Sequence, residues 1–253
     1  MNLHAVRAIY TSRLDSHRRF VVLSLVSPVL STALYFIVFA AALGPHFAYF
    51  NGVGYGEFIV PGLIMLSVVT DTIYTAAYSI HAPKISGTLY ETLSAPISAV
   101  EIVAGHVGAA ATKAVVLGTV TLLVARLFVD FHVIHPLHLM SLLLLSSLTC
   151  GCLGLTIGIM TETPQRLTLM VALIITPLTF LGGCFYSLQT LPPIWRHIAL
   201  LNPMIYITSG FRWSFYGVSD LDIMVSYVVV VAALSISAMV VWKILQSGFK
   251  LRS

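Results

Sequence analysis

Charged residues are scarce in this chain, and their scarcity excludes a water-soluble architecture. Only 9% of the 253 residues are Asp, Glu, Lys or Arg, whereas 58% are hydrophobic. Soluble domains have about a quarter charged residues. Thirteen basic and nine acidic side chains cannot cover a 27.5 kDa globule in water. The composition therefore predicts an integral membrane protein and disfavours nucleic-acid binding.

Motifs for catalysis and for metal binding are also lacking. The chain has no GxSxG elbow, no HExxH helix and no GxxxxGK[ST] phosphate loop, so we predict that it is not itself an enzyme. Its three cysteines form neither an even set nor a CxxC pair. Three histidines recur every third residue, but Pro136 interrupts them: His132, His135 and His138. We interpret them as interfacial residues rather than a metal site, which is the alternative.

Six apolar stretches are long enough to cross a bilayer, whose core of about 30 Å needs roughly 20 helical residues. They are 20–43, 58–80, 105–129, 137–160, 167–185 and 223–245. We therefore predict an all-α membrane protein with a six-span domain over 20–245 and a cytoplasmic tail over 246–253. Within the fourth stretch, Gly154 and Gly158 have the small-xxx-small spacing that lets two helices approach closely.

The positions of Lys and Arg predict the orientation. Cytoplasmic loops carry an excess of these residues. One set of alternate segments holds nine of them, whereas the opposite side holds none in the loop over 44–56 and at most Arg126, Arg196 and Arg212 elsewhere. The nine are Arg7, Arg13, Arg18, Arg19, Lys84, Arg166, Lys243, Lys250 and Arg252. Both termini are therefore predicted to be cytoplasmic.

The N-terminal segment 1–19 has the pattern of an amphipathic helix. Leu3, Val6, Tyr10 and Leu14 recur at helical spacing, and the arginines lie off that stripe. Such a helix is expected to lie on the inner membrane surface. An ordered positive flank is the simpler alternative.

The cytoplasmic stretch 84–101 contains the signals of one short helix. Thr88 and Glu91, which follow Gly87, have the spacing of a capping box, and Pro96 cannot continue the helix. The helix would present three side chains to a partner: Leu89, Tyr90 and Leu93. Because so short a helix is marginal in water by itself, we expect it to dock on another surface.

The outside segment 186–220 is too long for a simple connection between neighbouring spans. Pro192 and Pro193 precede one apolar stretch, and Asn202 and Pro203 separate it from a second that contains Arg212. This pattern predicts two short helices broken at Asn-Pro. Their aromatic content places them at the membrane interface or partly within the membrane, as a candidate outer gate.

Two ionisable residues, Asp71 and Lys113, lie within the apolar stretches. A rise of 1.5 Å per residue places both about 12 to 14 Å from the inner boundary, so they can meet. Charges in a bilayer are usually paired or line a water-filled path. The functional interpretation is a pair on a translocation path. The structural alternatives are an ion pair between neighbouring helices or a Lys113 that reaches the interface.

Several motifs occur in the order of one known family. They are FIVPGLIM at 58–65, GTLYETLSAP at 87–96, PLTFLGGCFYSL at 177–188, LPP at 191–193, NP at 202–203 and GFR at 210–212. On these motifs, which cover nearly the whole chain, it resembles the ABC-2 type transporter permeases. Among these it is most similar to the small six-span permeases of the bacterial inner membrane.

The resemblance implies a homodimer in membrane lipid, with each half bound to a separate cytoplasmic ATPase that carries ATP and Mg. It implies that 87–96 is the coupling helix, that the N-terminal helix is interfacial and that the outer hairpin is re-entrant. No cofactor is implied in this chain itself. An acidic residue at Asp71 is not part of the family pattern, which leaves its role open.

These observations predict the permease subunit of an ABC exporter. A proton-coupled secondary transporter that uses Asp71 and Lys113 is the first alternative, although the absence of an internal repeat weakens it. A membrane interaction protein without transport activity is the second. The residues do not identify the cargo.

Overall fold

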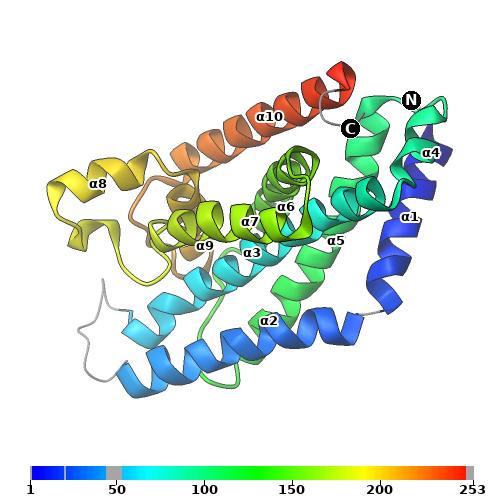
Figure 1. The fold of residues 1–253 in the computed structure, drawn as a ribbon. Helices are drawn as coiled ribbons and strands as arrows, with labels where there is room; N and C mark the ends of the chain where they lie inside the picture. Colours follow the sequence, from blue (N-terminus) through cyan, green and yellow to red (C-terminus); the bar gives the residue numbers. More distant parts are fainter. Residues whose placement is uncertain (1, 20, 44–52, 249–253) are drawn as a thin grey trace.

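Helices make up the architecture of this computed structural model, which describes residues 2–19, 21–43 and 53–248 (Figure 1). In chain order they are α1 (Leu3–Arg19), α2 (Val21–Tyr35) with a π-helical continuation (Phe36–Leu43), α3 (Tyr55–Ser86), α4 (Leu89–Ser94), α5 (Ala99–Ala125), α6 (Pro136–Met160), α7 (Pro164–Phe180), α8 (Pro193–Leu200), α9 (Pro203–Tyr216) and α10 (Ile223–Ser247). The predicted all-α class is confirmed.

Four helices in the described residues are long and apolar enough to cross a membrane: α3, α5, α6 and α10. Two further apolar helical stretches, Ser24–Phe39 and α7, are shorter. Each of the six predicted apolar stretches overlaps one of these helical segments. The helical assignment therefore follows the hydrophobic pattern, although only four of the segments reach spanning length by themselves.

The short helices lie at opposite ends of the molecule. In Figure 1, α1, α4 and the last turns of α10 lie at one end, and α8 lies at the other. Part of the count of Lys and Arg depends on the loop at 44–52 and the tail at 249–253. Both segments lie outside the described residues. The arrangement separates the predicted docking helix from the predicted outer hairpin by the length of the long helices.

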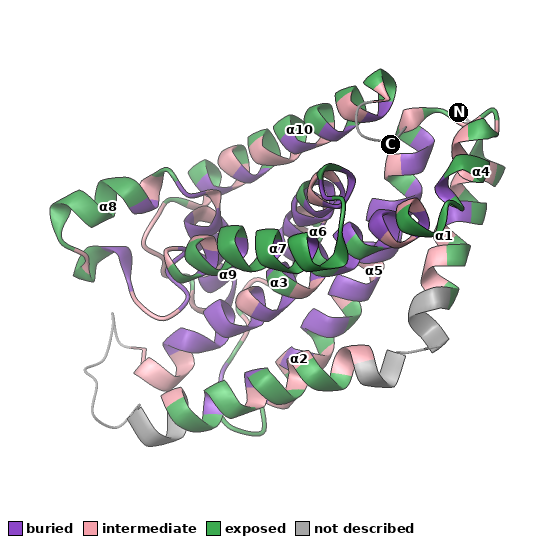
Figure 2. Ribbon diagram, viewed as in Figure 1, coloured by how far each residue is buried: buried purple, intermediate pink, exposed green. Residues whose placement is uncertain are grey.

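Helix α3 forms the centre of the packing. It contacts α5, α6 and α9, and most of its residues from Phe58 to Ile80 are buried. Figure 2 shows the buried residues gathered on these central helices, whereas α2, α8 and α10 have long exposed stretches. The exposed residues of α10 are largely apolar, among them Val228 and Ile236. Such an apolar face is stable in contact with lipid.

Helices α3 and α6 cross with their backbones in contact. A Cβ added at Gly154 would lie 2.4 Å from the Ile73 carbonyl oxygen, and one at Gly158 would lie 2.3 Å from that of Ala77. The predicted small-xxx-small face is confirmed. Without side chains at these two positions, α6 can pack directly on the central helix.

We expect Gly158→Ala to destabilise the protein by about 1 to 3 kcal/mol, because the added methyl group overlaps the α3 backbone. Gly108→Ala is the matched control, since a Cβ there meets only the Tyr10 ring at 3.5 Å. The thermal midpoint in detergent is the measurement. Equal midpoints for the two variants would contradict this account of the crossing.

Candidate functional site

The charged pair predicted between two apolar helices is present. Lys113 on α5 donates to Asp71 Oδ1 on α3 at 2.9 Å and to Thr75 Oγ1 at 3.0 Å. The Thr75 hydroxyl lies 3.4 Å from the other Asp71 oxygen. The two charged side chains are only 8% and 15% exposed. The helices therefore hold a satisfied ion pair, with Lys113 fixed by two acceptors.

Asp71 also lines a groove of about 460 Å³ between α2, α3 and α7. Lys113 is not among the lining residues, so Asp71 faces the groove and Lys113 supports it from behind. The wall is rich in hydroxyl groups: Ser27, Ser31, Thr32, Tyr35, Ser67, Thr70, Tyr74, Thr176 and Thr179. Sequence reasoning missed these residues. Their only signal is a raised content of Ser and Thr within apolar stretches.

The predicted short helix exists as α4, but its predicted capping box is wrong. Thr88 precedes α4 with helical backbone angles, φ −69° and ψ −14°, and its side chain makes no capping bond. The Thr88 hydroxyl lies instead 3.0 Å from that of Ser86. A capping side chain needs an extended backbone to reach the amides of the first turn. The chain turns at Gly87, where φ is +79°.

The observed capping box lies at the start of α5, on Ser98 and Glu101. Glu101 accepts from the Ser98 amide at 2.8 Å, and Ser98 Oγ accepts from the Glu101 amide at 3.4 Å. Ser98 has the extended backbone that a cap requires. The Ser-x-x-Glu spacing was visible in the sequence, but it is the same spacing as in Thr88 and Glu91. Backbone conformation decided between the two.

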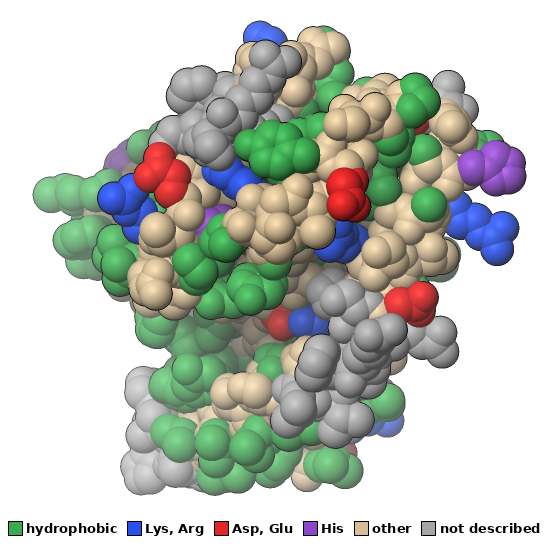
Figure 3. All heavy atoms as spheres, turned by 45° about the vertical axis from the view of Figure 1, so that its right-hand side comes forward, with side chains coloured by type: hydrophobic (Ala, Val, Ile, Leu, Met, Phe, Trp, Pro, Cys, Tyr) green, Lys and Arg blue, Asp and Glu red, His purple; other side chains and the backbone are tan. Residues whose placement is uncertain are grey.

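Helix α4 exposes only part of the predicted face: Tyr90 points outward as predicted, whereas Leu89 and Leu93 pack toward the protein. Leu89 is only 2% exposed and packs with Ile80 and Ile102, while Leu93 packs against the edge of the same cluster. The exposed face holds Tyr90 and Glu91. Leu89 was therefore wrongly predicted as a docking residue, because a six-residue helix needs an apolar anchor on its own protein. Figure 3 shows acidic and basic side chains over this end of the molecule.

At the opposite end, the predicted helical hairpin is present. Pro193 and Pro203 begin α8 and α9 as their first residues, and Pro192 precedes α8. Asn202 caps α9 by accepting from the Met204 amide at 3.0 Å, and it donates to the Leu178 carbonyl of α7 at 2.6 Å. The two helices differ in surroundings: α9 is largely buried, whereas α8 exposes apolar side chains.

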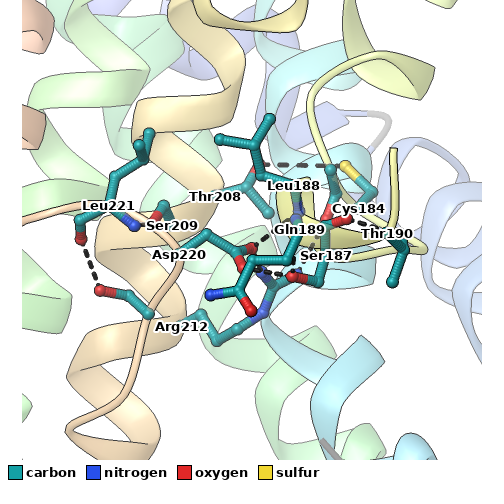
Figure 4. A network of polar contacts seen from close by, with 12 residues as sticks. Cys184, Ser187, Leu188, Gln189, Thr190, Thr208, Ser209, Arg212, Asp220 and Leu221 are labelled. Atoms are coloured by element: carbon teal, nitrogen blue, oxygen red, sulfur yellow. Dashed lines mark hydrogen bonds and ion pairs between the residues drawn. The ribbon is translucent and has the colours of Figure 1, made fainter. Parts of the chain in front are cut away.

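Arg212, on α9, is buried in a polar network with residues of the 184–190 segment and the 220–221 segment (Figure 4). It is 3% exposed and forms an ion pair with Asp220 at 3.0 Å. Its second terminal nitrogen donates to the Gly183 carbonyl at 2.8 Å, and its guanidinium lies 3.8 Å from the centre of the Phe58 ring. Asp220 also accepts from the Ser187 hydroxyl and from the Leu188 amide. Arg212 thus ties α9 to the segment that leads into α8.

The N-terminal helix α1 packs on α5. Ile9 is its buried residue and meets α5 at Gly105, and the Tyr10 hydroxyl lies 2.9 Å from that of Thr112. The predicted helix is present, but Ile9 was missing from the predicted stripe, and Leu3 is 67% exposed. Contact with α5, rather than amphipathicity alone, therefore determines which side of α1 is covered.

The histidines near Pro136 belong to an aromatic cluster. The His135 ring stacks on the Trp213 ring, with ring centroids 4.2 Å apart. The His138 ring forms a T-shaped contact with the same Trp213 ring, with centroids 5.2 Å apart. The Tyr227 ring also lies near His138, with ring centroids 6.0 Å apart. Within the described ranges, no three His, Cys, Asp or Glu side chains are grouped so that they could hold a metal ion.

The amino-acid sequence is similar to those of known membrane transport proteins. Residues 5–216 match the family model described as ABC-2 type transporter. The chain is 34% identical to the inner membrane transport permease YadH of Escherichia coli K12, over 98% of this chain and 97% of that protein. It is also 24% identical to nodulation protein J of Rhizobium leguminosarum bv. viciae, over 72% of this chain and 71% of that protein.

Proposed function

The chain belongs to the ABC-2 type transporter family, and from this premise we propose that it is the permease subunit of an ATP-driven exporter. Two copies form the membrane-spanning part, and each binds a separate cytoplasmic ATPase that holds ATP and Mg. The observation that carries the proposal is the family match over 5–216 together with a short helix, α4, isolated between two long apolar helices at one end of the molecule.

The proposed topology has six spans with both termini in the cytoplasm of a bacterium. Helices α2, with its π-helical continuation, and α7 supplement the four helices of spanning length. The end that holds α1 and α4 faces the cytoplasm, and α8 faces outward. This orientation is supported by the concentration of Lys and Arg in the N-terminal segment and in alternate loops. We propose the inner membrane as its location, which is supported by the similarity to YadH, described as an inner membrane transport permease.

The cargo path that we propose follows the groove between α2, α3 and α7. Hydroxyl groups and one carboxylate are spread along a wall whose exposed surface is otherwise mainly apolar. Because Lys113 neutralises Asp71 from behind, the wall offers polar contacts without a net charge. In a dimer, a second copy would face the open side of this groove.

At the outer end, we propose that α8 and α9 form a gate. Pro192, Pro193, Asn202 and Pro203 define the two helix starts, and Arg212 anchors α9. The exposed side chains of α8 include Ile194, Trp195 and Ile198. A helix with this apolar face suits the outer leaflet, where aromatic and aliphatic side chains are stable.

The function is tested by purifying the chain alone and together with a separate ABC ATPase subunit. We expect the isolated chain to hydrolyse no ATP, because its sequence has no GxxxxGK[ST] phosphate loop, whose backbone amides and Lys would orient the phosphates. The complex is expected to hydrolyse ATP. A proton-coupled secondary transporter, which the buried pair of Asp71 and Lys113 would suit, would instead respond to a pH gradient and bind no ATPase. Either that behaviour or robust hydrolysis by the isolated chain would overturn the proposal.

The docking helix gives a second prediction. We expect Glu91→Arg, on the exposed face of α4, to leave the permease folded but to weaken ATPase binding at least tenfold, which corresponds to about 1.4 kcal/mol. A misplaced charge in such a contact is costly because it loses water without gaining a partner. Asp130→Arg is the control, since it makes the same change of charge at an exposed position in the loop between α5 and α6. Binding is measured by co-purification, and undiminished recovery of the ATPase would exclude this face of α4 as the docking surface.

A further inference from the structure

Helix α4 is connected to the long helices through two non-helical joints. Upstream, Gly87 has a left-handed backbone at φ +79°, and an added Cβ there would meet nothing within 4 Å. Downstream, Ala95 is extended and Pro96 follows it before α5 begins. Joints of this kind let a short helix move, so the contacts on either side of them decide which other helices move with it.

The upstream side is attached to α6 by Lys84, in the last turn of α3. Its ammonium group donates to the carbonyl oxygens of Ile159 at 2.8 Å and of Thr161 at 3.2 Å. These carbonyls lie at the C-terminal end of α6, where the helix dipole favours a positive charge. His81, one turn earlier and fully buried, lies 3.3 Å from both the Gly158 carbonyl and the Thr161 hydroxyl. Lys84 and its neighbour His81 thus bind the end of α6 to the residues that precede α4.

The downstream side is attached to α1 by Glu101, in the first turn of α5. One carboxylate oxygen caps α5 through the Ser98 amide at 2.8 Å, and the other accepts from the Asn2 amide. Asn2 in turn caps α1, because its side-chain oxygen accepts from the His4 amide at 3.1 Å. Glu101 is only 4% exposed. A single buried carboxylate therefore joins the starts of two helices that are 99 residues apart in the sequence.

We propose that Lys84 and Glu101 are positioning residues that transmit the movement of α4 to α6 and to α1, respectively. The inference rests on the proposed function, because it takes α4 as the element that the ATPase moves. Both contacts are charge-assisted hydrogen bonds, which are shorter and stronger than neutral ones and depend on direction. The close packing of α6 on α3 at Gly154 and Gly158 extends the upstream connection along both helices.

The proposal makes the two connections separable. Loss of the Lys84 ammonium leaves the Glu101 contacts intact, and loss of the Glu101 carboxylate leaves those of Lys84 intact. A residue that only stabilised the fold would lower stability without changing which helix follows α4. The discriminating quantity is therefore the distance between α4 and each attached helix when the ATPase binds nucleotide.

The experiment uses the permease and ATPase complex in lipid nanodiscs, with the three cysteines replaced by alanine. Spin labels are placed at exposed positions, Ser94 with Met160 for the α6 connection and Ser94 with Thr11 for the α1 connection. In the otherwise unmodified chain, both distances are expected to stay constant when Mg-ATP is added. Lys84→Met should let only the first distance change, and Glu101→Ala only the second.

Conservative variants control for lost stability. Lys84→Arg keeps hydrogen-bond donors for the α6 carbonyls, so the distance between Ser94 and Met160 should again stay constant. Glu101→Gln keeps one acceptor oxygen, so the distance between Ser94 and Thr11 should change by an intermediate amount. If Lys84→Met fails to insert, Lys84→Gln takes its place with the same expected direction. Distances that stay constant in both disruptive variants, or that change in the unmodified complex, would overturn the relay while leaving the proposed function intact. An unmodified chain that binds no ATPase would overturn both.

Discussion

Replacement of Arg212 by Met is expected to destabilise the protein by about 3 to 5 kcal/mol, because it strands the buried Asp220 carboxylate without its cation. The two side chains are 3% and 2% exposed, so little water reaches them. The variant also loses the bond to the Gly183 carbonyl and the contact with the Phe58 ring. A fall in the thermal midpoint in detergent is the measurement.

Two further variants separate the pair from the rest of the network. Asp220→Asn strands Arg212 in the same way, and the double variant Arg212→Met with Asp220→Asn should cost less than the sum of the two. Arg196→Met is the matched control, since Arg196 is exposed on α8 and its loss should change stability by less than about 0.5 kcal/mol. A control as damaging as Arg212→Met would show that the ion pair is not the cause.

The second large effect is expected at Asp71 and Lys113. Removing one partner of a fully buried pair costs about 3 to 5 kcal/mol, and the cost here should lie toward the lower end because Asp71 faces a groove. Lys113→Met should be the more damaging single variant in stability, because it leaves a carboxylate with only the Thr75 hydroxyl as a partner. Asp71→Asn keeps an oxygen that can still accept from Lys113.

A double-mutant cycle of Asp71→Asn and Lys113→Met measures the interaction itself. We expect the double variant to be more stable than the sum of the single effects predicts. The cycle is read twice, by thermal stability and by ATP hydrolysis of the complex in liposomes. Additive effects in both readings would exclude an interaction between the two residues. Coupling in stability alone would make the pair structural and remove it from the proposed path.

Much of the fold follows from one-dimensional patterns. Apolar stretches identify the long helices, since a chain in lipid must satisfy its backbone hydrogen bonds within each segment. Proline marks two of the predicted helix starts: Pro193 and Pro203 each begin the helix predicted after them, because a first residue needs no amide donor. The depths of Asp71 and Lys113 follow from the helical rise, so their contact was foreseeable.

Other features depend on contacts between segments that are distant in the sequence. Thr88 and Ser98 both precede a glutamate by three residues, yet only Ser98 caps a helix, because the turn at Gly87 leaves Thr88 in a helical conformation. Arg212 looks like an exposed residue of an outer hairpin in the sequence, but its partner Asp220 and the Gly183 carbonyl bury it.

The sequence by itself determined the membrane class, the order of the helices, the breaks at proline and the shared depth of the charged pair, because each depends on local composition and on the rise of a helix. Tertiary structure alone decided that Leu89 faces inward, that Glu101 joins α1 to α5 and that hydroxyl groups from three helices line one groove. These features depend on which face of each helix meets a neighbour. In an apolar chain, nearly every helix face is hydrophobic enough to be buried, so hydrophobicity does not distinguish one face from another.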